Sequence, residues 1–131
     1  FTAPLTTVLA PDEIVIAVEF PGLPPGTGWG FEEFAQRRGD FAVAGVAALV
    51  SADGGAARDI RIALMGLHDT PVRARGAEAA FLEGGIEAAA AAVRGDADPM
   101  NDLHGSADYR LHLAGVLTRR ALTAAVERAG Q

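Results

Sequence analysis

The sequence predicts an α+β fold in one domain spanning residues 1–131: an antiparallel meander of three to four strands, followed by three helices packed on one face. Three observations lead to this prediction. Runs of β-branched and alternating apolar residues occupy the first half of the chain. After Thr70-Pro71 the chain becomes rich in alanine and glutamate, and its last segment carries apolar residues at helical spacing.

The clearest strand signal is the β-branched run from Ile14 to Phe20, which follows a turn at Pro11-Asp12-Glu13. The stretch from Pro21 to Gly28 is rich in proline and glycine, which indicates a loop. We expect a second strand from Trp29 to Gln36. The run from Phe41 to Val50 is apolar on both faces, so periodicity leaves it open between a buried strand and a buried helix.

A hairpin turn is predicted at Asp53-Gly54-Gly55, and the alternating run from Ile60 to Met65 predicts the strand that follows it. Two helices are expected beyond it, from Ala74 to Leu82 and from Ile86 to Val93, separated by Gly84-Gly85. Glutamates flank this glycine pair and would repel an anion, so a break between helices is the better interpretation than a phosphate site.

The last helix is predicted to begin after Ser106, a favourable N-cap, and to run to about Arg128 before Gly130. Asp108 in its first turn suits the helix dipole. One broad arc of this helix is apolar, which favours packing on a sheet. It contains Leu111, Leu113, Leu117, Ala121, Leu122, Ala125 and Val126.

Composition excludes several classes of function. Half of the residues are apolar, and the formal net charge of −6 disfavours non-specific nucleic-acid binding, which needs a basic surface. The chain has no cysteine, so disulfides and iron–sulfur ligation within it are excluded. No apolar run approaches the ~18 residues that would span a membrane. Its histidines and aspartates fall in separate loops without metal-ligand spacing, so we predict no metal site.

The stretch Arg37-Arg38-Gly39-Asp40 places two cations and a carboxylate on a predicted tight turn. An arginine presents a planar fork that grips phosphate and stacks on flat rings, and Asp40 could pin one guanidinium. The alternative is a solvated turn with a surface ion pair. The glycine-rich stretch from Gly26 to Gly30 lacks the strand, helix and acid of a dinucleotide fingerprint, so we expect an ordinary loop there.

Arg110 lies inside the apolar arc of the last helix, where a charge must be paired or reach outward. It is expected either to form a structural pair with an acid or a carbonyl, or to contact a partner domain. Trp29 and Tyr109 are candidates for the core or for stacking on a flat cofactor, and His104 is expected to bond a backbone carbonyl. No nucleophile or acid–base pair can be argued, so no catalytic residue is predicted.

Taken in order, several motifs resemble the C-terminal domain of the FAD-binding medium subunit of molybdenum hydroxylases, the carbon monoxide dehydrogenase and xanthine dehydrogenase type. The resemblance covers the whole chain. It is carried by Leu9-Ala10-Pro11-Asp12-Glu13-Ile14-Val15, Phe31-Glu32-Glu33-Phe34, Arg37-Arg38-Gly39-Asp40-Phe41-Ala42, Gly45-Val46-Ala47, His104-Gly105-Ser106-Ala107-Asp108-Tyr109-Arg110 and Arg119-Arg120-Ala121-Leu122.

This resemblance implies an oxidoreductase domain that closes over FAD held mainly by a separate N-terminal domain. It places Ile14 and Val15 near the flavin and Arg37, Arg38 and Asp40 beside its ring. Some relatives carry a lysine where this chain has Ala35, so one cofactor contact would be missing. Because the chain starts with Phe1 in mid-pattern, we expect it to be part of a longer subunit.

The same resemblance implies a cytoplasmic bacterial electron-transfer complex. Its partners would be an iron–sulfur small subunit with [2Fe-2S] clusters and a large subunit with the molybdenum cofactor. The domain would then pass electrons without being catalytic by itself. The alternative hypothesis is a non-catalytic module of the same fold that docks subunits through the exposed face of its last helix and holds no cofactor. The substrate, the electron acceptor and the oligomeric state stay open.

Overall fold

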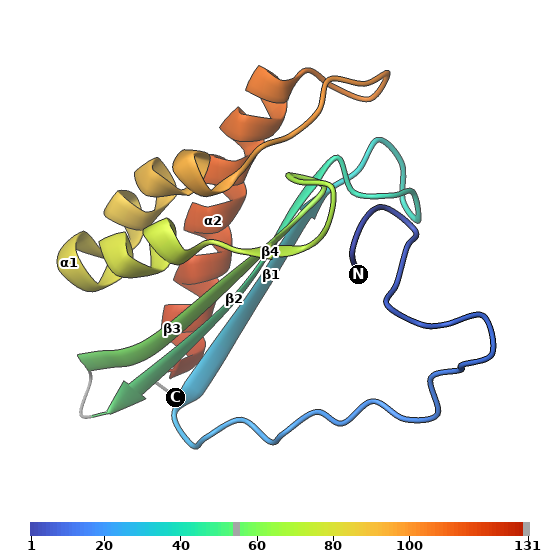
Figure 1. Ribbon diagram of the computed structural model, residues 1–131. Coiled ribbons are helices and arrows are strands. Elements are labelled where there is room, and N and C mark those ends of the chain that lie inside the picture. Colours follow the sequence, from blue (N-terminus) through green and yellow to red (C-terminus); the bar gives the residue numbers. More distant parts are fainter. Residues whose placement is uncertain (54–55, 130–131) are drawn as a thin grey trace.

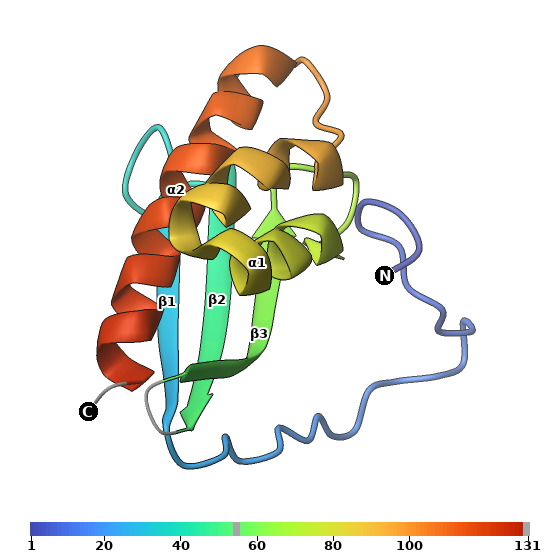
Figure 2. The ribbon, with the colours of Figure 1, turned by 90° about the vertical axis from the view of Figure 1, so that its left-hand side faces the viewer.

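A computed structural model describes residues 1–53 and 56–129. It contains one antiparallel sheet of four strands in the order β1-β2-β3-β4, covered on one face by two α-helices (Figures 1 and 2). The elements are β1 (Thr27–Phe34), β2 (Ala44–Asp53), β3 (Ala56–Met65), β4 (Val72–Arg73), α1 (Arg75–Ala92), the 3-10 helix η1 (Val93–Asp96) and α2 (Ala107–Ala129). The predicted α+β class and antiparallel meander are confirmed.

Alternation along the strands builds the core between the sheet and the helices. Val46, Ala48 and Val50 on β2 are buried, whereas the intervening Ala47 and Leu49 are only partly covered. This period of two resolves the ambiguous run from Phe41 to Val50 as a strand. The apolar arc of α2 supplies the opposite side of the core, and among its predicted members Leu113, Leu117, Ala121, Leu122 and Ala125 are buried.

The expected count of three helices is wrong, because the described residues form two α-helices. The segments expected from Ala74 to Leu82 and from Ile86 to Val93 are the two halves of α1, which is kinked at Gly85. Gly85 has φ 72° and ψ −158°, a backbone conformation that glycine adopts without a side-chain penalty. The predicted break at the glycine pair thus appears as a non-helical residue at Gly85, where the two helical halves of α1 meet at a kink.

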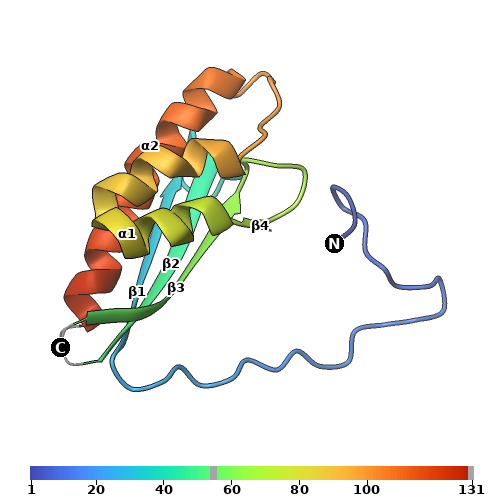
Figure 3. The same cartoon turned by 60° about the vertical axis from the view of Figure 1, so that its left-hand side comes forward.

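The strand predicted from Ile14 to Phe20 does not form. This segment is irregular, and the side chains of Ile14, Ile16 and Phe20 are 80%, 90% and 87% exposed. It runs as a wide arc on the side of the sheet away from the helices (Figures 1 and 3). A β-branched run favours extended backbone, but a strand also needs a hydrogen-bonded neighbour. Within the described residues, the sheet starts with β1 instead and gains the short β4, which the sequence did not predict.

The strand predicted from Trp29 forms within β1, but the glycine-rich stretch from Gly26 to Gly30 is not the ordinary loop that was predicted, because its residues from Thr27 onward make up the first half of β1. Gly28 and Gly30 face α2, and a Cβ built on them would lie 1.9 Å from the carbonyl oxygens of Ala125 and Ala121. No side chain fits in that space. The glycines therefore let the helix backbone rest directly on the strand.

Helix ends follow their predicted chemistry in part. The Ser106 hydroxyl accepts a hydrogen bond from the Tyr109 backbone N–H at 3.2 Å, so the predicted N-cap of α2 is confirmed. The N-terminus of α1 is capped by a residue distant in sequence, because the Asp96 carboxylate accepts from the N–H groups of Gly76 and Ala77.

The predicted hairpin turn and helix stop involve residues 54–55 and 130, which lie outside the described residues. No helix of the described residues is long and apolar enough to cross a membrane.

Candidate functional site

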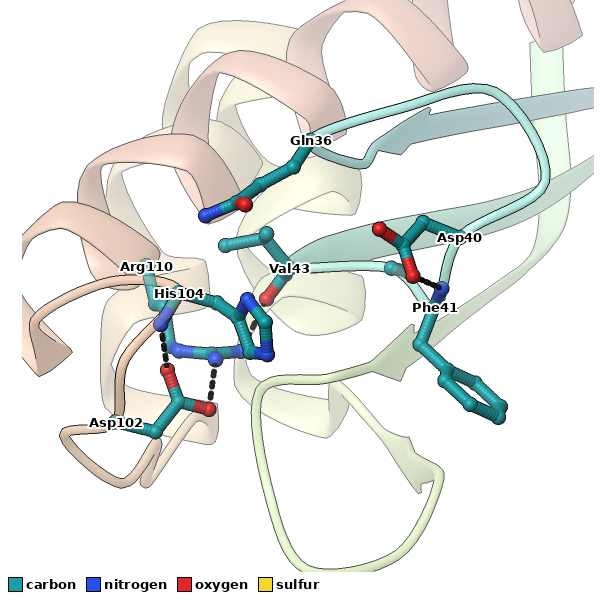
Figure 4. Close-up of a pocket in the computed structure, with 8 residues that line it drawn as sticks. Gln36, Asp40, Phe41, Val43, Asp102, His104 and Arg110 are labelled. Carbon is teal, nitrogen blue, oxygen red and sulfur yellow. Dashed lines mark hydrogen bonds and ion pairs between the residues drawn. The ribbon is translucent and has the colours of Figure 1, made fainter.

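Three connecting segments meet at one end of the sheet and form what we call the loop face: the β1–β2 loop (residues 35–43), the β3–β4 loop (residues 66–71) and the connector before α2 (residues 97–106). A cavity of about 250 Å³ opens between the β1–β2 loop and the connector (Figure 4). It is lined by Gln36, Asp40, Phe41, Ala42, Val43, Asp102, His104 and Arg110.

A second, wider cavity of about 460 Å³ lies between the β1–β2 and β3–β4 loops. It shares Asp40, Phe41 and Ala42 with the first cavity, so one stretch of chain separates the two. The remaining lining residues are Glu33, Met65, Gly66, His68, Asp69, Thr70 and Pro71. The β1–β2 loop is therefore the central element of the loop face.

The predicted tight turn in the β1–β2 loop is confirmed. The Asp40 N–H donates to the Arg37 carbonyl at 3.2 Å, and Gly39 takes a left-handed φ of 82°. The loop is closed at its base, where the Val43 N–H donates to the Phe34 carbonyl at 2.8 Å. The expectation that Asp40 pins a guanidinium is wrong, since its carboxylate accepts from the Phe41 N–H at 3.2 Å instead. The short Asp side chain satisfies its own turn locally.

Both arginines of the turn are exposed, and neither has an ion-pair or hydrogen-bond partner for its guanidinium within residues 1–53 and 56–129. Phe41, which follows the turn, is 95% exposed and points away from the smaller cavity (Figure 4). The loop thus presents two cations and a flat aromatic ring outward; Phe41 lines both cavities, whereas Arg37 and Arg38 line neither. Such groups can hold an anionic or planar aromatic ligand.

The other two predicted site residues are not brought to this turn. Ile14 and Val15 lie in the segment before β1, are 80% and 63% exposed, and line neither of the two cavities. Pro4, near the start of that segment, does reach the β3–β4 loop, where it faces His68 and Asp69 across a smaller pocket. The segment therefore passes beside the loop face without packing Ile14 or Val15 against it.

Arg110 joins the three segments of the loop face. Its side chain is buried, and its guanidinium donates to the Val43 carbonyl at 2.5 Å, the Gly66 carbonyl at 2.9 Å and the Asp102 carboxylate at 2.5 Å. The prediction of a structural pair with an acid or a carbonyl is confirmed. We call this arrangement of Arg110 with Val43, Gly66 and Asp102 the arginine clamp.

Asp102 also orders the connector, because its carboxylate accepts from the backbone N–H groups of His104 and Gly105 at 2.8 and 3.1 Å. The hydrogen bond from Arg110 is the main cause that holds the pKa of this carboxyl below its usual value, and the bond from the His104 N–H adds to it. His104 thus contributes a backbone donor to the connector, and its side chain lines the smaller cavity.

Acid should weaken the arginine clamp. A carboxyl whose folded pKa is depressed adds stability above its unfolded pKa, and this contribution is lost as the pH falls through the folded value. We expect Asp102→Asn to be less stable than the wild type at neutral pH, with the difference shrinking in acid. Urea unfolding at a series of pH values measures it, and a difference that stays constant from neutral to acid pH would contradict the assignment.

Each of the two candidate aromatic residues contacts a neighbouring side chain of this chain. Trp29 is 52% exposed on the sheet face away from the helices, with the Arg128 guanidinium 3.9 Å from its ring centroid. Tyr109 makes an edge contact with Phe34 at a centroid distance of 6.1 Å. Neither is a core residue. Gln36 is a lining residue for which the sequence gave no signal. His68 and Asp69 were considered only as metal ligands, although a polar pair in a loop directly after a strand also indicates a candidate binding site.

The fold and its loops match proteins of known type. Residues 29–125 match the family model described as CO dehydrogenase flavoprotein C-terminal domain. The chain is 35% identical over 130 residues to the carbon monoxide dehydrogenase medium chain of Hydrogenophaga pseudoflava, covering 95% of this chain and 45% of that protein. It is 30% identical to the putative xanthine dehydrogenase FAD-binding subunit XdhB of Escherichia coli, covering 98% of this chain and 47% of that subunit.

Solved structures agree with these relatives. Carbon monoxide dehydrogenase from Hydrogenophaga pseudoflava superposes with a TM-score of 0.90 at 38% identity, over 98% of this chain and 46% of that chain. Quinoline 2-oxidoreductase from Pseudomonas putida gives 0.73 at 34% identity, over 82% and 39%. The chain thus spans less than half the length of the relatives it matches. With a family model matched over most of its residues, this chain belongs to the CO dehydrogenase flavoprotein C-terminal domain family.

Proposed function

We propose that the loop face forms one wall of an FAD site in the medium subunit of a molybdenum hydroxylase, with the rest of the FAD held by an N-terminal FAD-binding domain. The observation that carries the proposal is the turn of the β1–β2 loop, where Arg37 and Arg38 are exposed without partners among the described residues. The loop borders an open cavity of about 460 Å³ through Asp40, Phe41 and Ala42 and carries the two cations just before them, which suits an anionic cofactor with a flat ring.

FAD would supply the electron-carrying chemistry, and the residues of this chain would orient it and set its electrostatic surroundings. Arg37 and Arg38 would place positive charge beside the ring, while the Asp40 carboxylate, occupied by the Phe41 N–H, would stay fixed in the turn. Ile14 and Val15 would pack near the flavin once the segment before β1 docks against the FAD-binding domain. Their present exposure leaves them available for such a contact.

The proposed partners follow from the same family. They are an iron–sulfur small subunit carrying [2Fe-2S] clusters and a large subunit carrying the molybdenum cofactor, in a cytoplasmic complex. Electrons would pass from those centres to FAD and then to an acceptor. The chain by itself would bind FAD weakly or not at all, because it would supply only part of the site.

The test is made on the FAD-loaded medium subunit. We expect Arg37→Gln and Arg38→Gln to lower the midpoint potential of the flavin, since removing a nearby cation disfavours added electrons. Arg120→Gln is the matched control, because Arg120 is exposed on α2 and away from the loop face. Unchanged FAD content and potential in both loop variants would refute the proposal. So would tight stoichiometric FAD binding by residues 1–131 alone.

A second candidate function, subunit docking without a cofactor, is favoured by the sheet face that the helices leave uncovered. An apolar groove there is lined by Trp29, Phe31, Ala47, Leu49 and Ala63, beside Arg61 and Arg73. The sequence placed such docking on α2, whereas this groove lies on the sheet. Replacing Phe31 by serine would impair assembly of the complex if docking is the role of this face.

A further inference from the structure

The arginine clamp connects the two loops that border the larger cavity. Val43 ends the β1–β2 loop and Gly66 begins the β3–β4 loop, and both of their carbonyls accept from the same Nη1 of Arg110. These residues are 67 and 44 positions from Arg110 in the sequence. One buried side chain from α2 therefore binds the end of one loop and the start of the other, directly beyond the last β2–β3 pair at Gly45 and Met65.

Gly66 makes the contact between the loops close. It has a left-handed φ of 68°, and a Cβ built on it would lie 2.9 Å from the carbonyl oxygens of Ala42 and Val43. The carbonyls of Val43 and Gly66 both point at Nη1 of Arg110, and two carbonyl dipoles directed at one place repel each other unless a cation lies between them. The Arg110 guanidinium supplies that cation at the place where the loops meet.

Asp102 fixes the direction of the guanidinium. Its carboxylate accepts from Nη2 of Arg110 (Figure 4), while Nη1 donates to the carbonyls of Val43 and Gly66, so the planar fork contacts all three segments of the loop face. The Nε of Arg110 is buried without a hydrogen-bond partner among the described residues. The orientation of the guanidinium is therefore set by the hydrogen bonds of Nη1 and Nη2 to the two loops and the connector.

We propose that Arg110 is a positioning residue for the flavin: it holds the Arg37–Asp40 turn and the His68-Asp69 loop at a fixed spacing without itself touching the ring. The inference rests on the proposed FAD site and adds a residue to it. Suppose that a unit charge moves from about 4 to about 6 Å away from an opposite charge on a reduced flavin. At an effective dielectric constant of about 20, their attraction weakens enough to change the ratio of reduced to oxidised flavin about tenfold. A loop shift of that size would therefore change the flavin potential.

The experiment uses the FAD-loaded medium subunit in its complex, with the variants Arg110→Gln and Arg110→Lys. We expect Arg110→Gln to change the oxidised-to-reduced ratio of the flavin, at a fixed electrode potential, by about tenfold. Arg110→Lys should recover part of this change, because an ammonium keeps the charge but lacks the planar fork. Leu113→Ala is the control, since Leu113 is buried on the same helix and makes none of the clamp contacts.

A folded Arg110→Gln variant with the wild-type potential would overturn the inference, and so would an equal shift in Leu113→Ala. If Arg110→Gln does not fold, Asp102→Asn replaces it, because this variant keeps Arg110 but removes its anionic partner; an unchanged potential there would also overturn it. If the Arg37 and Arg38 variants shift the potential and the clamp variants do not, positioning fails while the FAD site stands. If none of them does, the FAD site itself fails.

Discussion

Replacing Gly30 by alanine should unfold the domain or leave it severely destabilised. The added Cβ would lie 1.9 Å from the Ala121 carbonyl oxygen, and the helix backbone cannot yield as a flexible side chain would. Moving α2 away from β1 would open the core along the whole strand. We expect a loss of about 3 kcal/mol or more in the free energy of unfolding, measured by urea titration monitored by circular dichroism.

Gly95→Ala provides the matched control. A Cβ built on Gly95 meets nothing within 4 Å, and its φ does not lie in the left-handed region. This variant should therefore stay within about 0.5 kcal/mol of the wild type, the usual range for a surface substitution. A Gly30→Ala variant that is as stable as Gly95→Ala would show that α2 does not rest on β1 as closely as described.

The sequence predicted the parts of the fold that local chemistry decides. The alternating apolar pattern from Ile60 to Met65 correctly predicted a strand, and Ser106 correctly marked the start of α2. The tight turn predicted at Arg37–Asp40 also forms, with Gly39 in the left-handed region. Each of these depends on residues close together in the chain, so their spacing alone carries the signal.

What the sequence could not predict depends on distant neighbours. Gly28 and Gly30 indicated a loop, because only the position of α2 explains glycine inside a strand. The run from Ile14 to Phe20 indicated a strand, because β-branched residues favour extended backbone whether or not a partner strand exists. Propensity describes a residue by itself, whereas both of these outcomes are decided by what lies opposite.

In the candidate site, too, the sequence predicted the features that depend on residue type and missed those that depend on distant neighbours. Arg110 stood out in the sequence as a charge within an apolar arc, which correctly indicated a buried pair. Its carbonyl partners at Val43 and Gly66 could not be identified, since any loop may supply a backbone carbonyl and nothing in residue type marks which one does. The cations of the β1–β2 turn were found from the sequence, and the cavities on either side of it required the fold.

The second large effect on stability is expected at a buried carboxylate of α1 that contacts both β3 and β4. Glu78 on α1 is 7% exposed, and one of its oxygens accepts from both the Ile62 N–H at 2.8 Å and the Arg73 Nε at 2.6 Å. The hydrogen bond to Glu78 is also the main cause that raises the pKa of Arg73. Glu78 thus joins α1 to β3 and β4 through groups that the sheet itself leaves unpaired.

We expect Glu78→Ala to cost about 2–4 kcal/mol in the free energy of unfolding, because it leaves the buried Ile62 N–H without an acceptor and Arg73 without its anion. Glu78→Gln keeps an acceptor oxygen in the same place and removes only the charge. Since Arg73 is 37% exposed, water screens that charge, and this variant should lose about 1 kcal/mol. Unfolding titrations of the two variants separate the contributions, and an equal loss in both would mean that the ion pair, and not the backbone acceptor, holds α1 to the sheet.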